Sequence, residues 1–269
     1  MNKTEDRIQK ALELSKISRL NPMQEETLKA ARNGNDILLL SPTGSGKTLA
    51  FLLPVLQNLD NSKAGVQVLV LVPSRELAIQ IEQVFKLFQS GFKVNCCYGG
   101  HSTRVEKNNL EQPPALLVGT PGRIAFHIRN KYINTASITH LVLDEFDKSL
   151  EFGFQEDMSF ILYHLKNLKQ RILTSATAMP DIPDFTGISS PIEINYLSHT
   201  PAKATGLKLK TVESASRDKT ATLFSLLCKL GNTTTLVFCN HRDAVEMISE
   251  VLSEKGIDHG VFHGKMEQA

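Results

Sequence analysis

The feature of this chain that most constrains its fold is a regular alternation of short apolar runs with longer amphipathic ones. Several runs have the length and aliphatic content of buried strands: Asp36–Leu40, Val66–Val72, Lys93–Tyr98, Ala115–Gly119, His140–Asp144 and Arg171–Ser175. Helical patterns separate them, as in Arg75–Phe88. Apolar strands that alternate with helices are typical of a parallel sheet covered on both faces. We therefore expect a doubly wound α/β domain over residues 1–195.

The alternation lapses and then resumes in the last third of the chain. From about Ile194 to Gly206 the sequence is rich in Tyr, Ser, Pro, Thr and Lys, and we interpret residues 196–206 as a linker. Further on, the pattern predicts strands at Leu207–Val212, Thr235–Cys239 and His259–Phe262 and helices at Asp218–Leu230 and Arg242–Lys255. These elements indicate a second α/β domain at 207–269. Because a doubly wound sheet needs more strands than these, we expect that domain to be incomplete.

Composition and charge limit the classes of function open to the chain. The formal net charge is +2, so any contact with a nucleic acid must be local rather than made by a broad basic surface. The N-terminal stretch lacks the apolar core of a signal peptide, and no apolar run reaches the ~18 residues that a membrane span needs. The 4 cysteines form no CxxC pair, which argues against a zinc site and for free thiols in a reducing compartment. We expect a cytoplasmic protein with no membrane segment.

A phosphate-binding loop is indicated directly after the first strand. Its residues are Ser41, Pro42, Thr43, Gly44, Ser45, Gly46, Lys47 and Thr48, and a helical run follows them. The two glycines permit a tight turn that brings backbone N–H groups onto phosphate oxygens, next to the positive end of a helix. Lys47 would reach the β- and γ-phosphates, and the Thr48 hydroxyl would bind Mg²⁺. Ser41 stands where a glycine often begins such loops.

Two adjacent carboxylates end a later strand. Asp144 and Glu145 follow the apolar run Leu141–Leu143, at the carboxyl end where open α/β sheets bind ligands. Asp144 would hold Mg²⁺, and Glu145 would polarise the attacking water. Acidic residues at strand ends are common, so this pair gains its meaning from the phosphate loop earlier in the same domain. Together the two motifs predict a Mg²⁺-dependent nucleoside triphosphatase.

A series of short motifs surrounds these two sites in a fixed order. They are Pro73-Ser74-Arg75-Glu76-Leu77, Gly99-Gly100, Thr120-Pro121-Gly122-Arg123, Asp144-Glu145-Phe146-Asp147, Ser175-Ala176-Thr177 and, in the second predicted domain, Leu236-Val237-Phe238-Cys239-Asn240, His263-Gly264 and Gln268. Each string alone is weakly specific, but their order and spacing together resemble the DEAD-box ATP-dependent RNA helicases of superfamily 2. The resemblance implies two RecA-like domains, the second one truncated in this chain, with ATP and Mg²⁺ as cofactors.

The same resemblance implies roles for the motif residues. RNA would be held along its sugar–phosphate backbone by Pro73, Arg75, Gly99, Gly100, Thr120, Gly122 and Arg123. Such contacts carry no base information, so binding would be independent of sequence, and 2′-hydroxyls would distinguish RNA from DNA. Asp147 would hydrogen bond to Ser175 and Thr177 and so couple the nucleotide site to closure of the two domains. A helix-start ion pair for Arg75 and a plain turn for the glycine doublet are the structural alternatives, and no protein partner is indicated.

The adenine-reading segment departs from the family pattern. Pro22 and Gln24 match the family's Q motif, in which the glutamine amide pairs with adenine. Leu20 and Asn21 replace the usual residues at their positions. No aromatic residue precedes Phe51, so a side chain that stacks on the base is missing upstream. We nevertheless expect ATP to be the nucleotide.

Two further departures bear on catalysis. Phe146 stands where the family has alanine, so its ring must find space under the following strand, while the acids around it are intact. Motifs V and VI, whose arginines reach the γ-phosphate in the family, do not occur in this chain. An arginine finger contributes about 10³–10⁵ in rate in GTPases. We therefore expect this chain to bind ATP or ADP but to hydrolyse ATP very slowly and not to unwind RNA.

The leading hypothesis is an RNA-dependent ATPase that unwinds short RNA duplexes or remodels ribonucleoproteins. An ATP-dependent RNA clamp or scaffold that does not unwind is the alternative, because both functions use the same motifs. A DNA translocase of the same superfamily is disfavoured by the PSRELAIQ, TPGR and SAT strings. A kinase or a transporter ATPase fits the phosphate loop and the acidic pair but not those strings.

Overall fold

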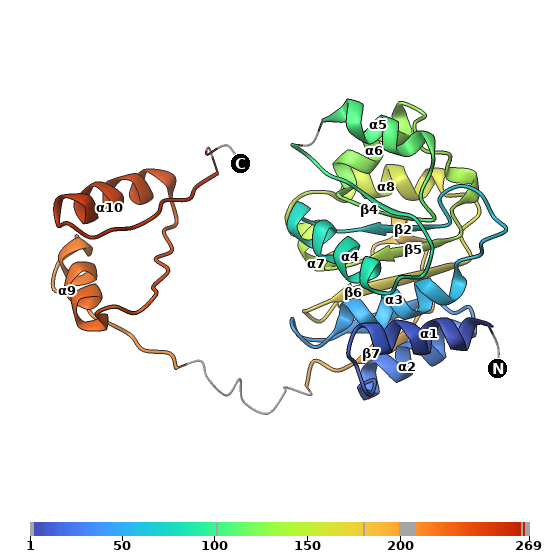
Figure 1. The fold of residues 1–269 in the computed structure, drawn as a ribbon, viewed down its shortest axis with the longest axis horizontal. Coiled ribbons are helices and arrows are strands. Elements are labelled where there is room, and N and C mark those ends of the chain that lie inside the picture. The colour runs from blue at the N-terminus through green and yellow to red at the C-terminus, as the bar shows by residue number, and fades with distance from the viewer. Residues whose placement is uncertain (1–2, 101, 180, 199–207, 265, 267–269) are drawn as a thin grey trace. The chain divides into compact units, whose positions relative to one another are not determined.

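The computed structural model describes residues 3–100, 102–179, 181–198, 208–264 and 266. The chain divides into two units, Met1–Ala204 and Thr205–Ala269 (Figure 1). The boundary between them falls within residues 196–206, the expected linker. Residues 199–206 of that segment lie outside the described residues, as do Leu207 and Gln268.

Unit 1 is built around a seven-stranded parallel sheet. Its strands are β1 (Ile37–Leu40), β2 (Val68–Leu71), β3 (Val94–Cys97), β4 (Leu116–Gly119), β5 (His140–Leu143), β6 (Gln170–Ser175) and β7 (Ile192–Asn195), in the spatial order β3-β4-β2-β5-β6-β1-β7. The strands β1 to β6 confirm those expected from the sequence, with small differences at their ends. The edge strand β7 was not expected, because only Ile194 of its residues is buried and Glu193 interrupts the apolar run.

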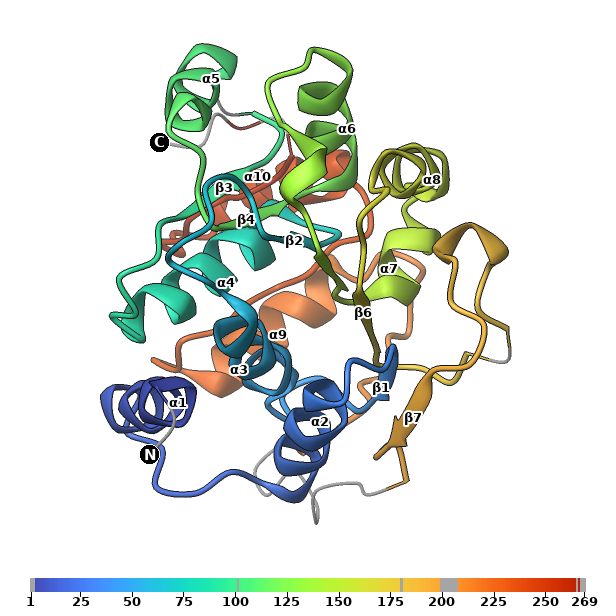
Figure 2. The same ribbon diagram turned by 90° about the vertical axis from the view of Figure 1, so that its right-hand side faces the viewer.

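Helices cover both faces of the sheet. One face packs against α1 (Lys3–Leu14), α2 (Pro22–Arg32), α3 (Lys47–Asn58) and α4 (Arg75–Leu87). The other packs against α5 (Thr103–Glu111), α6 (Pro121–Arg129), α7 (Phe146–Glu151), α8 (Gln155–His164) and the 3-10 helix η2 (Asp184–Thr186), while a second 3-10 helix, η1 (Thr135–Ser137), precedes β5. Figure 2 shows α2 and α3 on the opposite side of the sheet from α6 and α8. None of the helices in the described ranges is long and apolar enough to cross a membrane.

Side-chain alternation along the strands builds a core on each face. In β1, Ile37 and Leu39 pack toward α1 to α4, whereas Leu38 and Leu40 pack toward α5 to α8. Every residue of β1, β2 and β4 is buried, which explains why these strands read as continuous apolar runs. This is the doubly wound, RecA-like parallel α/β fold expected from the sequence.

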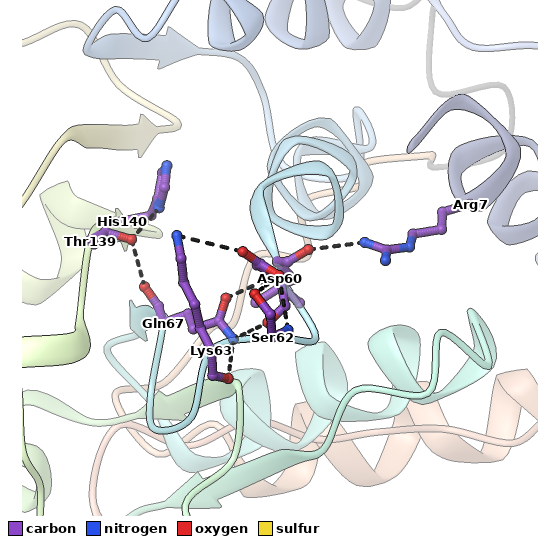
Figure 3. A network of polar contacts seen from close by, with 8 residues as sticks. Arg7, Asp60, Ser62, Lys63, Gln67, Thr139 and His140 are labelled. Atoms are coloured by element: carbon purple, nitrogen blue, oxygen red, sulfur yellow. Dashed lines mark hydrogen bonds and ion pairs between the residues drawn. The ribbon is translucent and has the colours of Figure 1, made fainter. Parts of the chain in front are cut away.

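A polar network lies at the amino edge of the sheet, where the chain turns from α3 into β2 (Figure 3). The amide of the buried residue Gln67 accepts from Asp60 N at 2.9 Å and donates to Asp60 O at 2.8 Å. The Asp60 carboxylate in turn accepts from Ser62 N at 2.9 Å and from Ser62 Oγ at 2.7 Å. Arg7 Nη1 ties α1 to this turn by donating to Leu59 O at 2.9 Å. These bonds hold the turn itself and lie at the end of the sheet opposite to the motifs described below.

Unit 2 matches the sequence prediction in its helices but not in its strands. Helices α9 (Thr220–Leu230) and α10 (Arg242–Glu254) lie where helices were expected. The predicted strands are wrong, because residues 208–212, 235–239 and 259–262 form none. Leu209, Phe238 and Phe262 are 87%, 91% and 74% exposed. A strand needs neighbours that pair its backbone groups and a layer that buries its side chains, and within the described part of unit 2 these segments have neither.

The close approach of β4 to β3 makes a first prediction. A Cβ added at Gly119 would lie 2.5 Å from Cys97 O and 2.7 Å from Ile124 Cδ1, so the backbone would have to shift. We expect G119A to lower the free energy of unfolding by roughly 1–3 kcal/mol. At Gly99 no atom lies within 4 Å of an added Cβ. The matched variant G99A should therefore change stability by less than about 0.5 kcal/mol, and equal urea midpoints for the two variants would contradict this packing.

Candidate nucleotide and RNA site

The motifs expected to carry function in unit 1 meet at the carboxyl edge of the sheet, where parallel strands end on the same side. Their positions, in spatial order, are Gly99-Gly100 after β3, Thr120 after β4, Pro73 after β2, Asp144 after β5, Ser175 at the end of β6 and Ser41 after β1. The strand order therefore groups the expected nucleotide residues over β5, β6 and β1. It groups the expected RNA residues over β3, β4 and β2.

The phosphate loop turns between β1 and α3 through two glycines in the left-handed region. The angle φ is 80° at Gly44 and 94° at Gly46, values that side chains disfavour. A Cβ on Gly46 would also come within 2.6 Å of Gln24 Nε2. At the start of the loop, Ser41 N donates to Ser175 O at 3.0 Å. The loop is thus held by β6 on one side and by α2 on the other.

Two residues at the start of α2 brace the phosphate loop. Asn21 and Gln24 form a capping box, in which Gln24 N donates to Asn21 Oδ1 at 2.9 Å and Asn21 N donates to Gln24 Oε1 at 3.0 Å. The same side chains reach the loop, since Asn21 Nδ2 donates to Ser45 O at 3.0 Å and Gln24 Nε2 donates to Gly46 O at 3.2 Å. Gln24 is buried and uses both ends of its amide inside the protein. Its part in adenine selection stays a prediction.

The Lys47 ammonium group turns back onto its own loop. Its Nζ donates to Ser41 O at 2.5 Å and to Pro42 O at 3.2 Å. Burial lowers the pKa of Lys47, against the attraction of Asp144 and the acids that follow it. The loop follows β1 and the acidic pair follows β5, and both strands pair with β6 in parallel. The two segments therefore lie on the same side of the domain, as a shared metal and triphosphate require.

The donor set of the loop fits a triphosphate with bound magnesium. Among the described residues, the buried hydroxyls of Ser41 and Ser45 have no hydrogen-bond partner. Buried polar atoms normally have one, and phosphate oxygens would supply it. Thr48 lies in the first turn of α3, at the positive end of the helix. The residues present therefore fit ATP on the loop, with Mg²⁺ held between Thr48 and Asp144.

Asp144 is a buried carboxylate that a neighbouring strand supports. Thr174 Oγ1 donates to Asp144 Oδ1 at 2.5 Å, and Glu145 N donates to Thr174 Oγ1 at 3.2 Å. Burial raises the pKa of Asp144 to about 6, and the charge of Glu145 adds to the shift. The hydrogen bond from Thr174 and the charge of Lys47 oppose it. A divalent cation would favour the ionised carboxylate that burial disfavours.

Glu145 has a strained backbone at the first turn of α7. Its φ and ψ are 47° and 50°, in the left-handed region that residues with a side chain seldom adopt. Such a conformation costs on the order of 1–3 kcal/mol and persists where the surrounding structure enforces it. The hydrogen bond from its N–H to Thr174 is part of that enforcement. Strain of this kind is concentrated at functional sites, in keeping with the catalytic role expected for Glu145.

The expected coupling triad is linked through Thr177. Thr177 Oγ1 donates to Asp147 Oδ2 at 2.9 Å. Ser175 Oγ donates to Thr177 O at 2.8 Å and accepts from Thr177 N at 3.1 Å. The resemblance had implied that Asp147 would hydrogen bond to both residues. Among the described residues, however, Ser175 bonds to Thr177 and not to Asp147. The Phe146 ring between the acids is fully buried in the core beside α5 to α8, with its centroid 6.1 Å from that of Phe185 in η2.

The expected RNA residues after β3 and β2 present an open turn and a stacked cation. Gly99 and Gly100 are exposed, and φ is 83° at Gly100. Arg75 is the first residue of α4, and its guanidinium lies over the Tyr98 ring, 5.4 Å from the ring centroid. The alternative of a helix-start ion pair is not observed for Arg75 in the described ranges. Pro73 is buried in the turn just before this helix.

The expected RNA residues after β4 form the first turn of α6. Thr120 occupies the N-cap position, and a Cβ on Gly122 would lie 3.2 Å from Asp157 Oδ2. Arg123, to which the resemblance assigned an RNA contact, has a partner within the protein. Its Nε donates to Glu106 Oε2 at 2.6 Å, and its side chain is 15% exposed. Its charge is therefore paired inside the protein.

Three supporting residues escaped the sequence analysis. Thr174 could have been found, because the parallel register pairs Leu143 with Leu173 and so sets Thr174 beside Asp144. Asn21 also had a readable signal, since an asparagine three residues before a glutamine is a capping-box pattern. Glu106 had none, because its partners come from segments remote in the sequence.

Comparison with known proteins identifies the family. A model of the DEAD/DEAH box helicase family matches residues 21–185, which is more than half of the chain. The chain belongs to this family. The match includes the phosphate loop, the acidic pair and the motifs over β3, β4 and β2, and it confirms the resemblance noted in the sequence.

Individual relatives agree with the family match. The chain is 34% identical over 256 residues to "DEAD-box ATP-dependent RNA helicase 6" of Oryza sativa subsp. japonica, covering 94% of this chain and 51% of that protein. It is 34% identical over 261 residues to "ATP-dependent RNA helicase DRS1" of Saccharomyces cerevisiae, covering 92% of this chain and 35% of that protein. A solved structure, of a hypothetical ATP-dependent RNA helicase from Sulfolobus tokodaii, matches with a TM-score of 0.64 and 25% identity, covering 93% of this chain and 72% of that one. The chain spans about half the length of the first of these relatives and about a third of the second.

The buried carboxylate of Asp144 predicts a pH-dependent difference in stability. Its folded-state pKa of about 6 lies above its ordinary value of 3.8, so the folded state loses stability as pH rises through this range. Asp144→Asn carries no such charge, and Thr174 can still donate to its side-chain oxygen. In buffer free of metal and nucleotide, D144N should become more stable than the unsubstituted protein as pH rises from 4 to 7. The difference between their free energies of unfolding should reach roughly 3 kcal/mol.

Chemical denaturation across this pH range measures the difference. The exposed Asp181→Asn controls for the loss of one negative charge. Parallel pH curves for D144N and the unsubstituted protein would show that Asp144 is not held in a costly ionised state.

Proposed function

We propose that this chain is the ATP-binding part of an ATP-dependent RNA helicase that couples ATP binding and hydrolysis to local unwinding of RNA or remodelling of ribonucleoproteins. In this proposal unit 1 is the helicase ATP-binding domain, and unit 2 belongs to the second RecA-like domain. The observation that carries it is the strand order β5-β6-β1, which sets the phosphate loop after β1 and the acidic pair after β5 on either side of β6. This order brings the Lys47 ammonium group, which would bind phosphate, and two carboxylates to one edge of the sheet, beside the strands that carry the expected RNA residues.

Each part of the nucleotide site has a task in the proposed reaction. Backbone N–H groups of the phosphate loop would receive the phosphates, and Lys47 would exchange its bonds with loop carbonyls for bonds to phosphate oxygens. Bound Mg²⁺ would neutralise developing charge on the phosphates, with Thr48 and Asp144 holding it. Glu145 would orient and polarise the attacking water.

The link to RNA runs through the end of β6. Asp147 in α7 is bonded to Thr177, so a shift of the acid-bearing helix moves the segment that follows β6. The support for RNA as the ligand comes from the exposed glycine turn and from the names of the relatives, which are ATP-dependent RNA helicases. Contacts by glycine N–H groups would read the backbone, so we infer binding that is independent of sequence.

We also propose a cytoplasmic location. The cysteines among the described residues are all free, as expected in a reducing compartment.

The nucleotide-site assignment predicts binding without rapid turnover. We expect residues 1–269 to bind Mg²⁺–ADP, and to release phosphate from ATP slowly even with RNA, because no arginine of motifs V or VI lies within this chain. Lys47→Ala should weaken ADP about 10-fold or more, since a charge-assisted hydrogen bond is lost. The exposed Lys29→Ala is the matched control and should leave affinity unchanged. Titration calorimetry measures the affinities, and equal binding by the two variants or fast RNA-stimulated phosphate release would refute the assignment.

The clamp alternative remains a distinct second function, because a clamp would use the same residues as a helicase. Glu145→Gln in the protein at its full natural length separates the two. The E145Q variant should still bind ATP but hydrolyse it more slowly. A helicase would then stall, whereas a clamp would stay on RNA and keep its function. We expect stalled strand displacement on RNA duplexes with E145Q. Retained function in the ATP-bound state would favour the clamp, and ATP-driven activity on DNA duplexes alone would favour a DNA translocase.

A further inference from the structure

A buried carboxylate joins two of the segments expected to contact RNA. Glu106 in α5 is only 1% exposed. Its Oε1 accepts from Tyr98 N at 3.1 Å. Its Oε2 accepts from Arg123 Nε at 2.6 Å and lies 2.6 Å from His127 Nε2. Two of these partners come from α6, and the third comes from the end of β3.

The negative charge of the Glu106 carboxylate is balanced by the groups that surround it. Burial raises the pKa of Glu106, but the hydrogen bonds from His127, Arg123 and Tyr98 N outweigh it and lower the pKa below its ordinary value. Glu106 is therefore ionised in the folded protein. A buried charge is stable only when it is paired and hydrogen bonded, and the guanidinium of Arg123 provides that pair.

The hydrogen-bond partners of Glu106 lie next to the segments expected to contact RNA, so the cluster can affect RNA binding as well as stability. Tyr98 directly precedes the exposed doublet Gly99-Gly100, so a bond to its N–H fixes the start of that turn. Arg123 directly follows Gly122 in the first turn of α6. Arg123 is held a second time within α5, because its Nη2 donates to Thr103 Oγ1 at 2.9 Å. One helix thus sets the distance between two turns that approach the same edge of the sheet.

We propose that Glu106 is a positioning residue for RNA, which ties the Gly99-Gly100 turn to the first turn of α6 so that both meet one RNA strand in register. The proposal rests on the RNA binding proposed above and adds a residue that contacts no RNA itself. It also changes the role of Arg123, whose guanidinium works chiefly as a strut between α5 and α6. Backbone N–H groups of the two turns, held at a fixed separation, then carry the phosphate contacts.

A metal site is the competing interpretation of the same cluster. Cys97, Glu106 and His127 each offer a ligand atom, and these atoms lie within 4.8 Å of one another. The guanidinium of Arg123, however, already supplies the positive charge on the oxygen that a metal would use. Burial also raises the pKa of Cys97, whereas a metal ligand must be a thiolate. The geometry therefore points to an ion-paired strut rather than to a metal.

Glu106→Gln tests the positioning role. The amide keeps the size of the side chain, but in either orientation it turns an N–H donor toward another donor, Arg123 Nε or Tyr98 N, so the strut should loosen. Glu111→Gln, exposed on the same helix, is the matched control. The measurements are the affinity for a fluorescent single-stranded RNA, the affinity for Mg²⁺–ADP, the thermal midpoint and the zinc content of the purified protein.

We expect E106Q to bind RNA about 10-fold more weakly while its ADP affinity stays within about 2-fold of the parent. E111Q should match the parent in both. A purely structural role would instead lower the thermal midpoint and weaken both ligands together, which would overturn the proposal, as would unchanged RNA binding by E106Q. One equivalent of zinc in the parent, lost in E106Q, would establish the metal site instead.

Milder variants keep the test decisive if E106Q does not fold. Thr103→Val removes only the second bond to Arg123 and should weaken RNA about 2- to 3-fold with ADP unaffected. In a double-mutant cycle, E106Q combined with Arg123→Ala should bind RNA no worse than the weaker single variant, because both changes break one strut. Additive losses, or no effect of T103V, would overturn it. If the parent binds ADP but no RNA, the proposed RNA function falls first and the positioning role with it.

Discussion

The parallel register of β5, β6 and β1 is the constraint on which the site depends. Leu40 pairs with Ser175, so β1 and β6 end level with each other, whereas β5 ends at Leu143, opposite Leu173. That register sets Asp144 beside Thr174 and anchors the phosphate loop on β6 through Ser41 N. A shift of one residue would exchange the two faces of a strand, burying side chains meant for the opposite core. The two apolar cores therefore help to fix the positions of Asp144 and the phosphate loop relative to β6.

The nucleotide side of the sheet edge stores unfavourable features that a bound triphosphate and metal would relieve. Asp144 is buried, which disfavours its ionised form. Lys47 is also buried, and its ammonium group donates hydrogen bonds to carbonyls of its own loop. Glu145 has a strained backbone. Each feature costs stability by itself. A phosphate chain would give Lys47 a charged partner, and a cation would favour the ionised Asp144. Preparation of this kind is typical of sites that are organised before their ligand arrives.

The sequence predicted most of unit 1 because its signals are local. Strands β1, β2 and β4 are continuous apolar runs, and the phosphate loop is a contiguous string between a strand and a helix. Contacts between remote segments escaped it, as with Glu106, whose partners lie 17 and 21 positions away in α6. The pairing of Arg123 with Glu106 was not expected for the same reason. The unit 2 strands failed because apolar runs such as Thr235–Cys239 show strand propensity, whereas a strand also needs neighbours to pair with.

The most direct test of this account is a crystal structure of the protein with Mg²⁺ and a non-hydrolysable ATP analogue. The account predicts Mg²⁺ coordinated by the Thr48 hydroxyl and held by Asp144, directly or through water. It also predicts that Lys47 Nζ leaves Ser41 O for a phosphate oxygen, while Thr174 keeps its bond to Asp144. A nucleotide bound elsewhere, or a Lys47 that keeps its loop bonds with no phosphate near it, would contradict the account.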